Sequence, residues 1–428
     1  MINHIKAVEP DQAMLLSVQL LSQSEHETLH SLKELSSLAT TVGYEVVAQI
    51  IQPRLQIHPA TFVGKGKISE IKETVHRCKV NLVIVDGLLS PKQGKNLERA
   101  IKCMVWDRTQ LILEIFAKNA KTSEAKRQIE LAQLQYMLPR LVGLWAHLDR
   151  ERGGIGASRG MGEKQIETDR RVIGMRIAQL KEELKHVAVE RKVQKKRRSD
   201  CLKVSLIGYT NAGKSTIMNA LTDSELLVED KLFATLESTT RLLDEKSRPK
   251  ILLSDTVGFI KNLPHELVAS FRSTLEVIRD AELLFHIVDI NALDYQEHIE
   301  TALQIVDDLG ADCIPRLLVF NKIDQVKDPT RVPIFRKKFP EAVFVSAQSG
   351  DVAELRESII RFFEKKMLTV QIRLEYQHSR NLSYIYEWSR VDQINYEDDG
   401  IHLRLTSSSD NLNRLRHHMG TSYFQEQT

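Results

Sequence analysis

Eight consecutive residues restrict what this chain can fold into more than any other segment does. Gly208–Ser215 (GYTNAGKS) match the pattern G-x-x-x-x-G-K-[ST]. Such a loop binds phosphate when a buried strand runs into it and a helix begins at its end. Lys203–Ile207 reads as that buried strand, and Thr216–Leu221 reads as the opening of the helix. The segment therefore predicts an open α/β sheet with a nucleotide-phosphate site at a strand end.

Different residues of this loop are expected to contact different parts of the nucleotide. Gly208 and Gly213 allow backbone N–H groups to turn toward the phosphates, next to the positive end of the helix dipole. Lys214 is expected to reach the β- and γ-phosphates, and the Ser215 hydroxyl is expected to bind Mg²⁺. We expect nucleotide contact along the whole loop: Gly208, Tyr209, Thr210, Asn211, Ala212, Gly213, Lys214 and Ser215.

A second motif, NKID, selects the base. It comprises Asn321, Lys322, Ile323 and Asp324 and follows the apolar segment LLVF. A carboxylate at Asp324 can accept hydrogen bonds from the ring N–H and the exocyclic amine of guanine, whereas adenine offers neither donor there. Leaving such a carboxylate unpaired costs about 1–3 kcal/mol, so the motif favours GTP and disfavours ATP. Asn321 is expected to bond the purine edge and Lys322 to lay its alkyl stem along the ring.

The segment DTVG predicts the switch that senses the γ-phosphate. Ile251–Ser254 reads as a strand that ends at Asp255, Thr256, Val257 and Gly258. Asp255 is expected to hold Mg²⁺ through water, and the Gly258 N–H to meet the γ-phosphate.

Two further segments complete the expected nucleotide site. The first switch is expected between the phosphate loop and DTVG, at Phe233, Ala234, Thr235, Leu236 and Glu237. Thr235 is the favoured Mg²⁺ ligand of this switch, and Thr239 is its rival. Ser346, Ala347 and Gln348 follow a short apolar segment, and the Ala347 N–H is expected to meet the guanine carbonyl.

Phe259, directly after DTVG, bears on the rate of hydrolysis. Many small GTPases carry glutamine there to orient the attacking water, which a phenylalanine ring cannot do. We therefore expect slow hydrolysis unless a cation or a partner stabilises the developing charge. In a group of related GTPases, an asparagine at the position of Asn211 ligates K⁺, so K⁺ joins Mg²⁺ as a candidate cofactor. The predicted catalytic residues are Lys214, Asn211, Thr235 and Gly258.

Composition limits the class of protein. The formal net charge is +3 over 428 residues, which excludes a uniformly basic chain. The four cysteines form no C-x-x-C pair, so neither zinc nor a disulfide framework is indicated. No apolar run approaches the roughly 20 residues that a spanning helix needs, and the start of the chain lacks a signal-peptide pattern. We expect a soluble, cytoplasmic protein that is monomeric on its own.

The N-terminal third predicts a second α/β unit followed by a helical arm. Strand-like and helical segments alternate up to Trp106, and the turn Phe62–Lys67 (FVGKGK) lies between two of them. Two stripes of apolar residues at heptad spacing then predict a helical hairpin, in which Pro139 should kink or end the first helix. The stripes are Leu131, Leu134, Leu138 and Leu141, and then Ile173, Ile177, Leu180, Leu184 and Val187.

The turn of this hairpin is rich in glycine and arginine. Gly153–Gly162 contains five glycines in ten residues and is flanked by basic side chains. Flexible backbone and guanidinium groups suit RNA phosphates and bases, although spacing alone leaves a solvated loop equally open. A second basic run, Lys195–Arg198, is interpreted as a solvated helix end, with RNA contact as the alternative.

Several motifs together resemble a known family. The chain resembles the HflX GTPases over roughly residues 40–365, because five motifs occur in the order found in that family. They are FVGKGK, DRTQLILEIFAKNAKTSEAKRQIELAQL, GGIG, ETDRR and GYTNAGKS. The resemblance implies binding to the large (50S) ribosomal subunit, splitting of stalled or idle ribosomes, and placement of the glycine-rich loop against ribosomal RNA. One departure is Met161 followed by Glu163 and Lys164, where the family usually has G-P-G-E and a small hydroxyl residue. The expected RNA contacts are Arg152, Gly153, Gly154, Arg159 and Lys164.

These observations predict four parts. They are an α/β subdomain (1–115), a helical hairpin arm (116–199) with its loop at 153–162, a P-loop GTPase domain (200–367) and a small α/β C-terminal domain (368–428). The aromatic residues Tyr384, Tyr386 and Trp388 are expected in the core of the last part. Alternatives to ribosome splitting are a role in ribosome assembly or RNA remodelling, and a regulatory switch that binds a protein partner.

Overall fold

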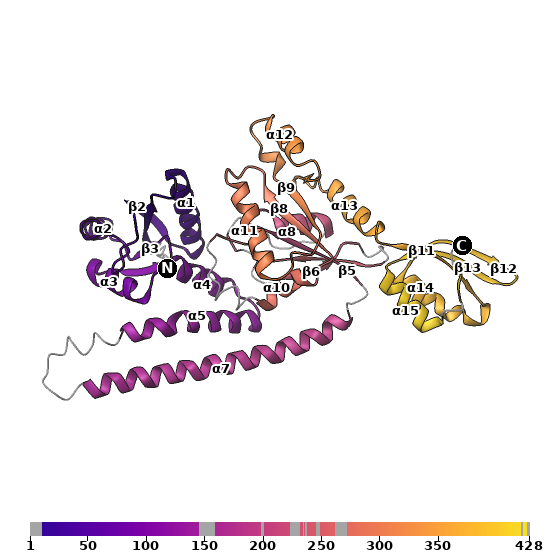
Figure 1. Cartoon of the computed structure of the whole chain (residues 1–428), viewed down its shortest axis with the longest axis horizontal. Coiled ribbons are helices and arrows are strands. Elements are labelled where there is room, and N and C mark those ends of the chain that lie inside the picture. The colour runs from indigo at the N-terminus through magenta and orange to yellow at the C-terminus, as the bar shows by residue number, and fades with distance from the viewer. Residues whose placement is uncertain are drawn as a thin grey trace, which may run out of the picture. The chain divides into compact units, whose positions relative to one another are not determined.

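The chain folds into two compact units, each described by itself. The computed structural model describes residues 11–144, 159–197, 201–222, 232–233, 235, 238–244, 249–261, 272–420 and 423–425. One unit comprises Met1–Ala188 with Asp230–Leu236 and Asn262–Arg272, and the other comprises Val189–Glu229, Glu237–Lys261 and Ser273–Thr428 (Figure 1). No helix in the described ranges is long and apolar enough to cross a membrane.

The first unit begins with a four-stranded parallel sheet in the order β2-β1-β3-β4. Its strands are β1 (Gln12–Leu20), β2 (Glu45–Arg54), β3 (Leu82–Val85) and β4 (Met104–Asp107). They alternate with α1 (Glu25–Val42), α2 (Lys65–Arg77), α3 (Pro91–Ile101) and α4 (Arg108–Asn119). Ser24 and Ser90 form capping boxes that fix where α1 and α3 begin. The expected α/β class is confirmed for this region, although the glycine-lysine segment expected as a turn already enters α2 at Lys65.

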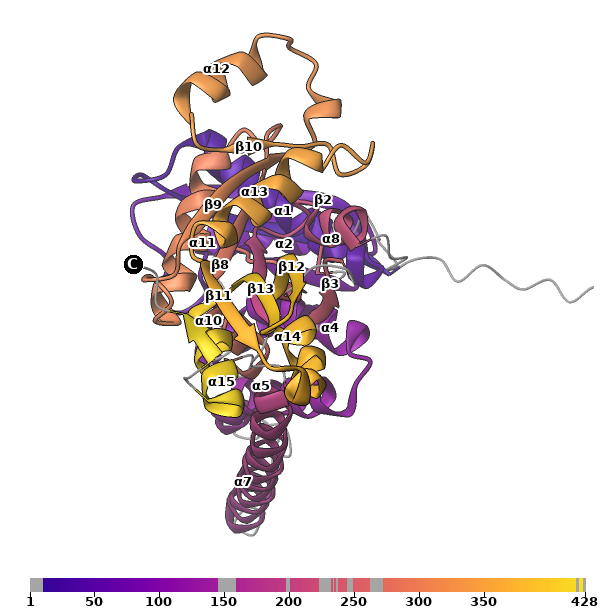
Figure 2. The same ribbon diagram turned by 90° about the vertical axis from the view of Figure 1, so that its right-hand side faces the viewer.

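The predicted hairpin is present as two paired helices. They are α5 (Ser123–Leu144) and α7 (Arg159–Arg197), and Figure 2 shows α7 almost along its axis. Arg176 donates to both carboxylate oxygens of Glu130 at 2.7 and 2.8 Å, and Arg127 pairs with Glu183 at 2.9 Å. These charge-assisted pairs join the helices beside the apolar stripes.

Of the two outcomes expected at Pro139, a kink or an end, the helix α5 does not end there but continues to Leu144. The start of α7 differs from the prediction. The glycine-rich loop was expected to run to Gly162, yet α7 begins at Arg159. Proline is tolerated inside a helix when surrounding contacts offset the lost hydrogen bond, and glycine costs only about 1 kcal/mol relative to alanine there. Residues 145–158, with Arg152, Gly153 and Gly154, lie outside the described ranges.

A buried carboxylate joins the base of the arm to the sheet. Asp107, 1% exposed, caps α4 by accepting from the Gln110 N–H at 2.9 Å. It also accepts from the Tyr136 hydroxyl at 2.8 Å and from Arg140 at 3.1 Å, both on α5. A buried charge is stable only when it is paired and fully hydrogen-bonded, so these contacts hold α4 and α5 as one packed element.

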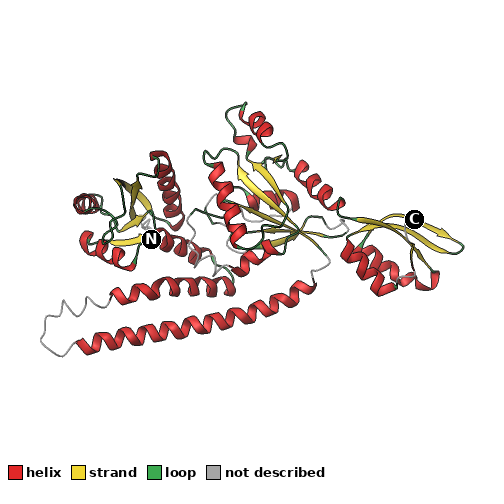
Figure 3. Cartoon of the chain, in the orientation of Figure 1, coloured by secondary structure: helices red, strands yellow, loops and turns green. Residues whose placement is uncertain are grey.

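The second unit contains a six-stranded sheet in the order β10-β9-β8-β5-β7-β6, parallel except for β6 (Figure 3). Its strands are β5 (Leu202–Gly208), β6 (Thr239–Leu242), β7 (Ile251–Asp255), β8 (Leu283–Asp289), β9 (Arg316–Asn321) and β10 (Val343–Phe344). The helices are α8 (Lys214–Thr222), α10 (Arg272–Arg279), α11 (Tyr295–Asp308), α12 (Arg331–Lys338) and α13 (Ala353–Glu364), with a short 3₁₀ turn η2 (Ile323–Gln325). The strand-loop-helix context expected around Gly208–Ser215 is present.

An antiparallel sheet in the order β12-β13-β11-β14 follows. Its strands are β11 (Leu368–Leu374), β12 (Arg390–Glu397), β13 (Gly400–Ser407) and β14 (Phe424–Gln425), with η3 (Tyr376–Asn381), α14 (Leu382–Trp388) and α15 (Ser409–Met419). Ile385 and Leu415 belong to its apolar core, and Trp388 packs against it. Tyr384 and Tyr386, expected in the core, are 37% and 48% exposed. That expectation was wrong because α14 has only one side facing the core, and Ile385, which lies between the two tyrosines, occupies that side.

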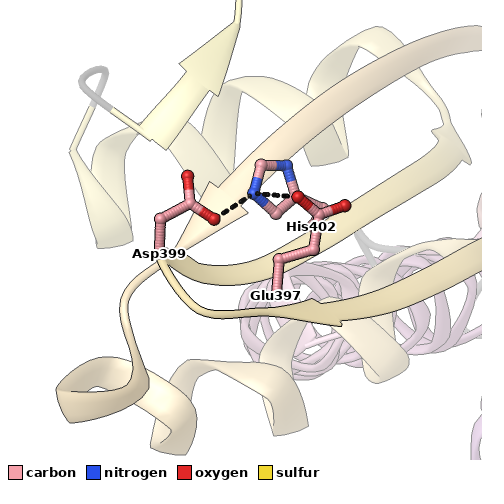
Figure 4. A group of neighbouring side chains, drawn as sticks. All are labelled: Glu397, Asp399 and His402. Atoms are coloured by element: carbon pink, nitrogen blue, oxygen red, sulfur yellow. Dashed lines mark hydrogen bonds and ion pairs between the residues drawn. The ribbon is translucent and has the colours of Figure 1, made fainter.

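The tip of the β12–β13 hairpin carries a small ion-pair cluster (Figure 4). His402 Nε2 lies 3.0 Å from Asp399 Oδ1 and 3.7 Å from Glu397 Oε2. The hydrogen bond from His402 lowers the pKa of Asp399, and Arg373 pairs with the other oxygen of that carboxylate at 3.2 Å. Arg373 of β11 and His402 of β13 both contact Asp399, so the cluster links two strands at an exposed turn, where such pairs contribute little to stability.

The histidine His286 lies deep in the six-stranded sheet of the second unit. His286 on β8 is 3% exposed, and its Nε2 has no hydrogen-bond partner within the ranges described above. Burial, followed by the charges of Arg316 and Lys214, lowers its pKa to about 4. Its neutral form is therefore the one that fits this sheet.

The stability of the protein should depend on the protonation of His286. Because the folded pKa of about 4 lies below the usual 6.5, the stability contribution is intact above about pH 6.5 and falls as pH decreases toward 4. The loss should reach about 2 kcal/mol at pH 5. The variant His286→Leu lacks this titration. When the pH falls from 7 to 5, its free energy of unfolding should therefore rise by about 2 kcal/mol relative to that of the wild type, as measured by urea unfolding followed by circular dichroism. A wild-type minus variant difference that is the same at both pH values would contradict this prediction.

Candidate functional site

The phosphate loop is held in place by close backbone packing. Gly208 has φ 144°, and a Cβ atom there would lie 2.2 Å from the Ile287 carbonyl oxygen of β8. Gly213 has φ 92°, and its Cβ would lie 2.2 Å from the side-chain nitrogen of Asn321. Neither position admits another residue without moving backbone or a core side chain. The two glycines of the motif are therefore required by packing as well as by phosphate geometry.

Lys214 lies buried at the centre of this loop. Its ammonium group donates to the carbonyl oxygens of Gly208 at 3.1 Å and Tyr209 at 2.8 Å. Burial lowers its pKa to about 8, and the charge of Asp255 opposes that shift. The buried hydroxyl of Thr210 has no hydrogen-bond partner among the described residues. A buried cation and an unsatisfied donor fit the anionic oxygens of a phosphate chain.

Ser215 and Asp255 meet as the sequence predicts for a magnesium site. The Ser215 hydroxyl donates to Asp255 Oδ2 at 2.5 Å, which brings the end of the loop to the end of β7. Mg²⁺ prefers hard oxygen ligands and keeps several waters. A hydroxyl and a carboxylate beside the phosphate loop fit that preference, and GTPases generally use Mg²⁺.

The DTVG segment continues along the phosphate loop. Phe259 N–H donates to the Gly208 carbonyl at 3.0 Å, and Thr210 N–H donates to the Phe259 carbonyl at 2.8 Å. A Cβ on Gly258 would lie 2.8 Å from Thr210 Cα and 3.1 Å from Lys214 Nζ. Phe259 itself is 2% exposed, so its ring is part of the core.

The base-recognition motif is tied to the phosphate loop by one carboxamide. Asn321 donates to the Ala212 carbonyl at 2.9 Å and accepts from the Ala347 N–H at 3.1 Å. Asp324 accepts from the Ser346 hydroxyl at 2.6 Å. Asn321 therefore links three loops that are distant in the sequence.

Ala347 lies in the turn that follows β10. Its N–H, expected to meet the guanine carbonyl, donates to Asn321 in this conformation. Ser346 and Gln348 lie in the same turn, which is closed by a bridge between Ser346 and Asp351.

The first switch segment has an environment that the sequence did not predict. Phe233, expected at the nucleotide, buries its ring against Phe116 of α4 and so belongs to the first compact unit. Thr235 lies two residues further along, whereas its rival Thr239 is in β6, in register with Asp255. Ala234, Leu236 and Glu237 lie outside the described ranges.

Two supporting residues were missed by sequence reasoning. Asp289, at the end of β8, pairs with Lys322 at 3.0 Å and orients the lysine of NKID. His298 on α11 stacks on Tyr209 with ring centroids 3.8 Å apart. An acidic residue at the end of an apolar strand could have indicated the first, but nothing local in the sequence indicates the second.

The predicted RNA contacts are only partly described. Arg159 and Lys164 lie in the first turns of α7, while Arg152, Gly153 and Gly154 lie outside the described ranges. The structure therefore leaves the RNA contact of the arm as a prediction.

Family models match three consecutive regions of the chain. A model described as GTP-binding GTPase N-terminal matches residues 29–117, and one described as GTP-binding GTPase Middle Region matches residues 119–198. A third, described as 50S ribosome-binding GTPase, matches residues 203–322 and contains the phosphate loop, DTVG and Asn321.

Curated relatives match nearly the whole chain. A protein named GTPase HflX from Caldanaerobacter subterraneus subsp. tengcongensis is 41% identical, over 96% of this chain and 94% of the relative. GTPase HflX from Escherichia coli is also 41% identical, over 91% and 92%. Among solved structures, a GTP-binding protein from Sulfolobus solfataricus in complex with GDP is 23% identical with a TM-score of 0.44, over 82% of this chain and 98% of that one.

The lowered pKa of Lys214 predicts proton uptake on nucleotide binding. Phosphate oxygens favour the charged ammonium, so binding should raise the pKa of Lys214 from about 8. Below pH 7 the lysine is already protonated, and little uptake is expected. At pH 8.5 most free protein must bind a proton, so GDP affinity should fall with pH by up to about tenfold per unit above 8.

Calorimetry of GDP binding in two buffers of different ionisation enthalpy measures this uptake directly. We expect a value near zero at pH 6.5 and more than half a proton at pH 8.5. Lys214→Arg, whose guanidinium stays charged, is the matched control and should show no uptake at either pH. Equal uptake by wild type and control would show that Lys214 is not the group that titrates.

Proposed function

Because the chain belongs to the HflX family of GTPases, we propose that its GTP-bound state binds the 50S ribosomal subunit and splits or recycles stalled or idle 70S ribosomes. The chain is a GTP hydrolase, and hydrolysis would reset it for another round. The observation that carries the proposal is the 50S ribosome-binding GTPase match at residues 203–322, preceded in the same chain by the matched middle region with its helical arm. A ribosomal task places the protein in the cytoplasm, and we infer that it is monomeric off the ribosome.

The site residues divide the work of hydrolysis between binding and charge stabilisation. Lys214 and the loop amides would hold the β- and γ-phosphates, and Asp324 would accept from guanine. Ser215 and Thr235 would hold Mg²⁺, with Asp255 acting through water; the ion neutralises charge that develops on the phosphate oxygens. Gly258 would direct its N–H to the γ-phosphate.

The chain has no evident side chain directly after DTVG that could orient the attacking water. Phe259 is buried and cannot orient a nucleophile, so we infer that the protein alone turns over slowly. Asn211 could bind a cation that stabilises the developing charge. It is exposed on the phosphate loop with φ 59°, which leaves its carboxamide accessible to a cation such as K⁺. A cation or a ribosomal surface would then supply the missing charge stabilisation.

The arm supplies the expected RNA contact. We propose that Arg152, Gly153, Gly154, Arg159 and Lys164 meet ribosomal RNA, with arginine and lysine on phosphates and glycine allowing close approach. Support comes from the paired helices α5 and α7 (Figure 1), because Arg159 and Lys164 lie in the first turns of α7.

The ribosomal function can be tested by pelleting and by subunit profiles. We expect the intact protein to pellet with 50S subunits and to convert 70S particles into subunits with a GTP analogue, but not with GDP or ATP. A variant with residues 153–162 shortened should lose both effects while binding GDP normally. Normal splitting by the shortened variant would exclude the arm as the ribosomal probe. Binding without splitting by the intact protein would favour a role in assembly.

The salt dependence of 50S binding tests the charged contacts separately. Replacing Arg152, Arg159 and Lys164 by alanine should reduce the slope of log affinity against log salt by about two to three. Alanine at Lys65, Lys72 and Arg77 on α2 removes equal charge from the same unit and is the matched control, with little expected change. A shallow slope in the wild type would instead favour a partner that is recognised through apolar protein contacts.

The K⁺ proposal predicts different rates in two salts. GTP turnover without ribosomes should be at least about tenfold faster in KCl than in NaCl at equal ionic strength. Asn211→Gly keeps the left-handed backbone accessible and removes the carboxamide, so it should bind GDP normally and lose the stimulation. Equal wild-type rates in the two salts would exclude a potassium site at Asn211.

A further inference from the structure

Thr210, the third residue of the phosphate loop, carries a buried hydroxyl. The residue is 7% exposed, and its Oγ1 has no hydrogen-bond partner in the part of the chain that the structure describes. A buried polar group without a hydrogen bond destabilises the folded state, so such groups are rare and call for an explanation. In a nucleotide-binding loop, the explanation is a polar partner that arrives with the nucleotide.

Contacts with the DTVG segment place this hydroxyl at the γ-phosphate end of the loop. A Cβ atom on Gly258 would lie 2.8 Å from both Cα and Cγ2 of Thr210, and 3.1 Å from Lys214 Nζ. Lys214 is expected to bind the β- and γ-phosphates, and the Gly258 N–H is expected to meet the γ-phosphate. The Thr210 methyl group lies against Gly258, so the hydroxyl on the same carbon lies beside these two groups.

Backbone hydrogen bonds hold Thr210 in register with this segment. Its N–H donates to the Phe259 carbonyl at 2.8 Å, and the Phe259 N–H donates to the Gly208 carbonyl at 3.0 Å. Two residues further along, the Lys261 N–H donates to the Tyr209 hydroxyl at 2.9 Å. Because these bonds fix the backbone on both sides, the Thr210 hydroxyl moves chiefly by rotation about its own Cα–Cβ bond.

Other polar side chains near DTVG already have partners. The Lys261 ammonium group pairs with Glu297 at 2.9 Å, and the Thr256 hydroxyl donates to the Leu206 carbonyl at 2.6 Å. The Thr210 hydroxyl has none within the described ranges, and a hydroxyl can donate one hydrogen bond while it accepts another. It is therefore suited to bridge a water molecule and a phosphate oxygen.

We propose that Thr210 is a catalytic residue whose hydroxyl accepts a hydrogen bond from the attacking water and donates one to an oxygen of the γ-phosphate. The inference rests on the proposed function in taking the Gly258 N–H to the γ-phosphate. It assigns to Thr210 the orientation of water that Phe259 cannot perform.

The reaction itself is the hydrolysis of GTP. The water oxygen bonds to the γ-phosphorus, and the bond from that phosphorus to the β–γ bridging oxygen breaks. GDP leaves with the electron pair, and both water protons end on the phosphate product. Thr210 keeps its own proton throughout, so its contribution is to hold the water in line for attack.

Single-turnover hydrolysis by the full-length protein, in KCl and without ribosomes, tests this role. Thr210→Val removes the hydroxyl and keeps the β-branched shape, so the rate constant of GTP cleavage should fall by about ten- to a hundredfold. The affinity for GDP should not change, and the affinity for a GTP analogue should fall by at most about threefold, because the water is held most strongly in the transition state. Thr210→Ser keeps the hydroxyl and should return the rate to within about threefold of the wild type.

Thr222→Val is the matched control. It removes a threonine hydroxyl of the same unit, one that donates to the Met218 carbonyl of α8 at 2.8 Å, and should keep the wild-type rate. A wild-type rate in Thr210→Val, or equally low rates in Thr210→Val and Thr210→Ser, would overturn the proposal. So would a fall in analogue affinity as large as the fall in rate, since the hydroxyl would then be a ground-state ligand of the γ-phosphate.

Urea unfolding of the nucleotide-free protein separates this role from a structural one. Because Thr210→Val removes a buried hydroxyl that has no partner among the described residues, its unfolding midpoint should equal or exceed that of the wild type. A lower midpoint would show that the hydroxyl stabilises the fold and would count against the proposal. All of these measurements are made without ribosomes, so an absence of 50S binding would contradict the proposed function and leave this inference standing.

Discussion

The nucleotide site depends on the carboxamide of Asn321. It bonds the phosphate loop at Ala212 and the strand-end turn at Ala347, and it begins the motif that contains Asp324. Because Asn321 is 2% exposed and both its polar atoms are satisfied, its place in the sheet fixes the separation of these loops. The closeness of Gly213 to this side chain makes the constraint mutual, since any larger residue there would displace Asn321.

A second constraint joins the parts of the N-terminal unit. Asp107 ends β4, caps α4 and binds two residues of α5, so a single buried carboxylate connects sheet, helix and arm. Burial makes that carboxylate costly unless each bond is kept, which favours movement of α4 and α5 together. The contact between α4 and Phe233 adds the first switch segment to the same helix.

Local sequence signals predicted most of the elements. Apolar segments and their periodicity are short-range features, and β1 to β4, α1 to α3 and the strand-loop-helix around Lys214 were predicted from them. The errors have nonlocal causes. The helix α7 begins within the glycine-rich segment, and Tyr384 and Tyr386 are half exposed beside Ile385, whose side chain packs into the core of the C-terminal sheet.

The sequence by itself determined the chemistry of this protein. The phosphate loop, NKID and DTVG specify guanine nucleotide through residue types whose donors and acceptors are set by covalent structure, and the order of motifs identified the HflX family. Tertiary structure decided which of these groups meet. It brought Ser215 to Asp255, placed Asp289 on Lys322 and His298 on Tyr209, and packed Phe233 against Phe116 of α4. These contacts join residues far apart in the chain, and strand order and burial select them, which no local pattern encodes.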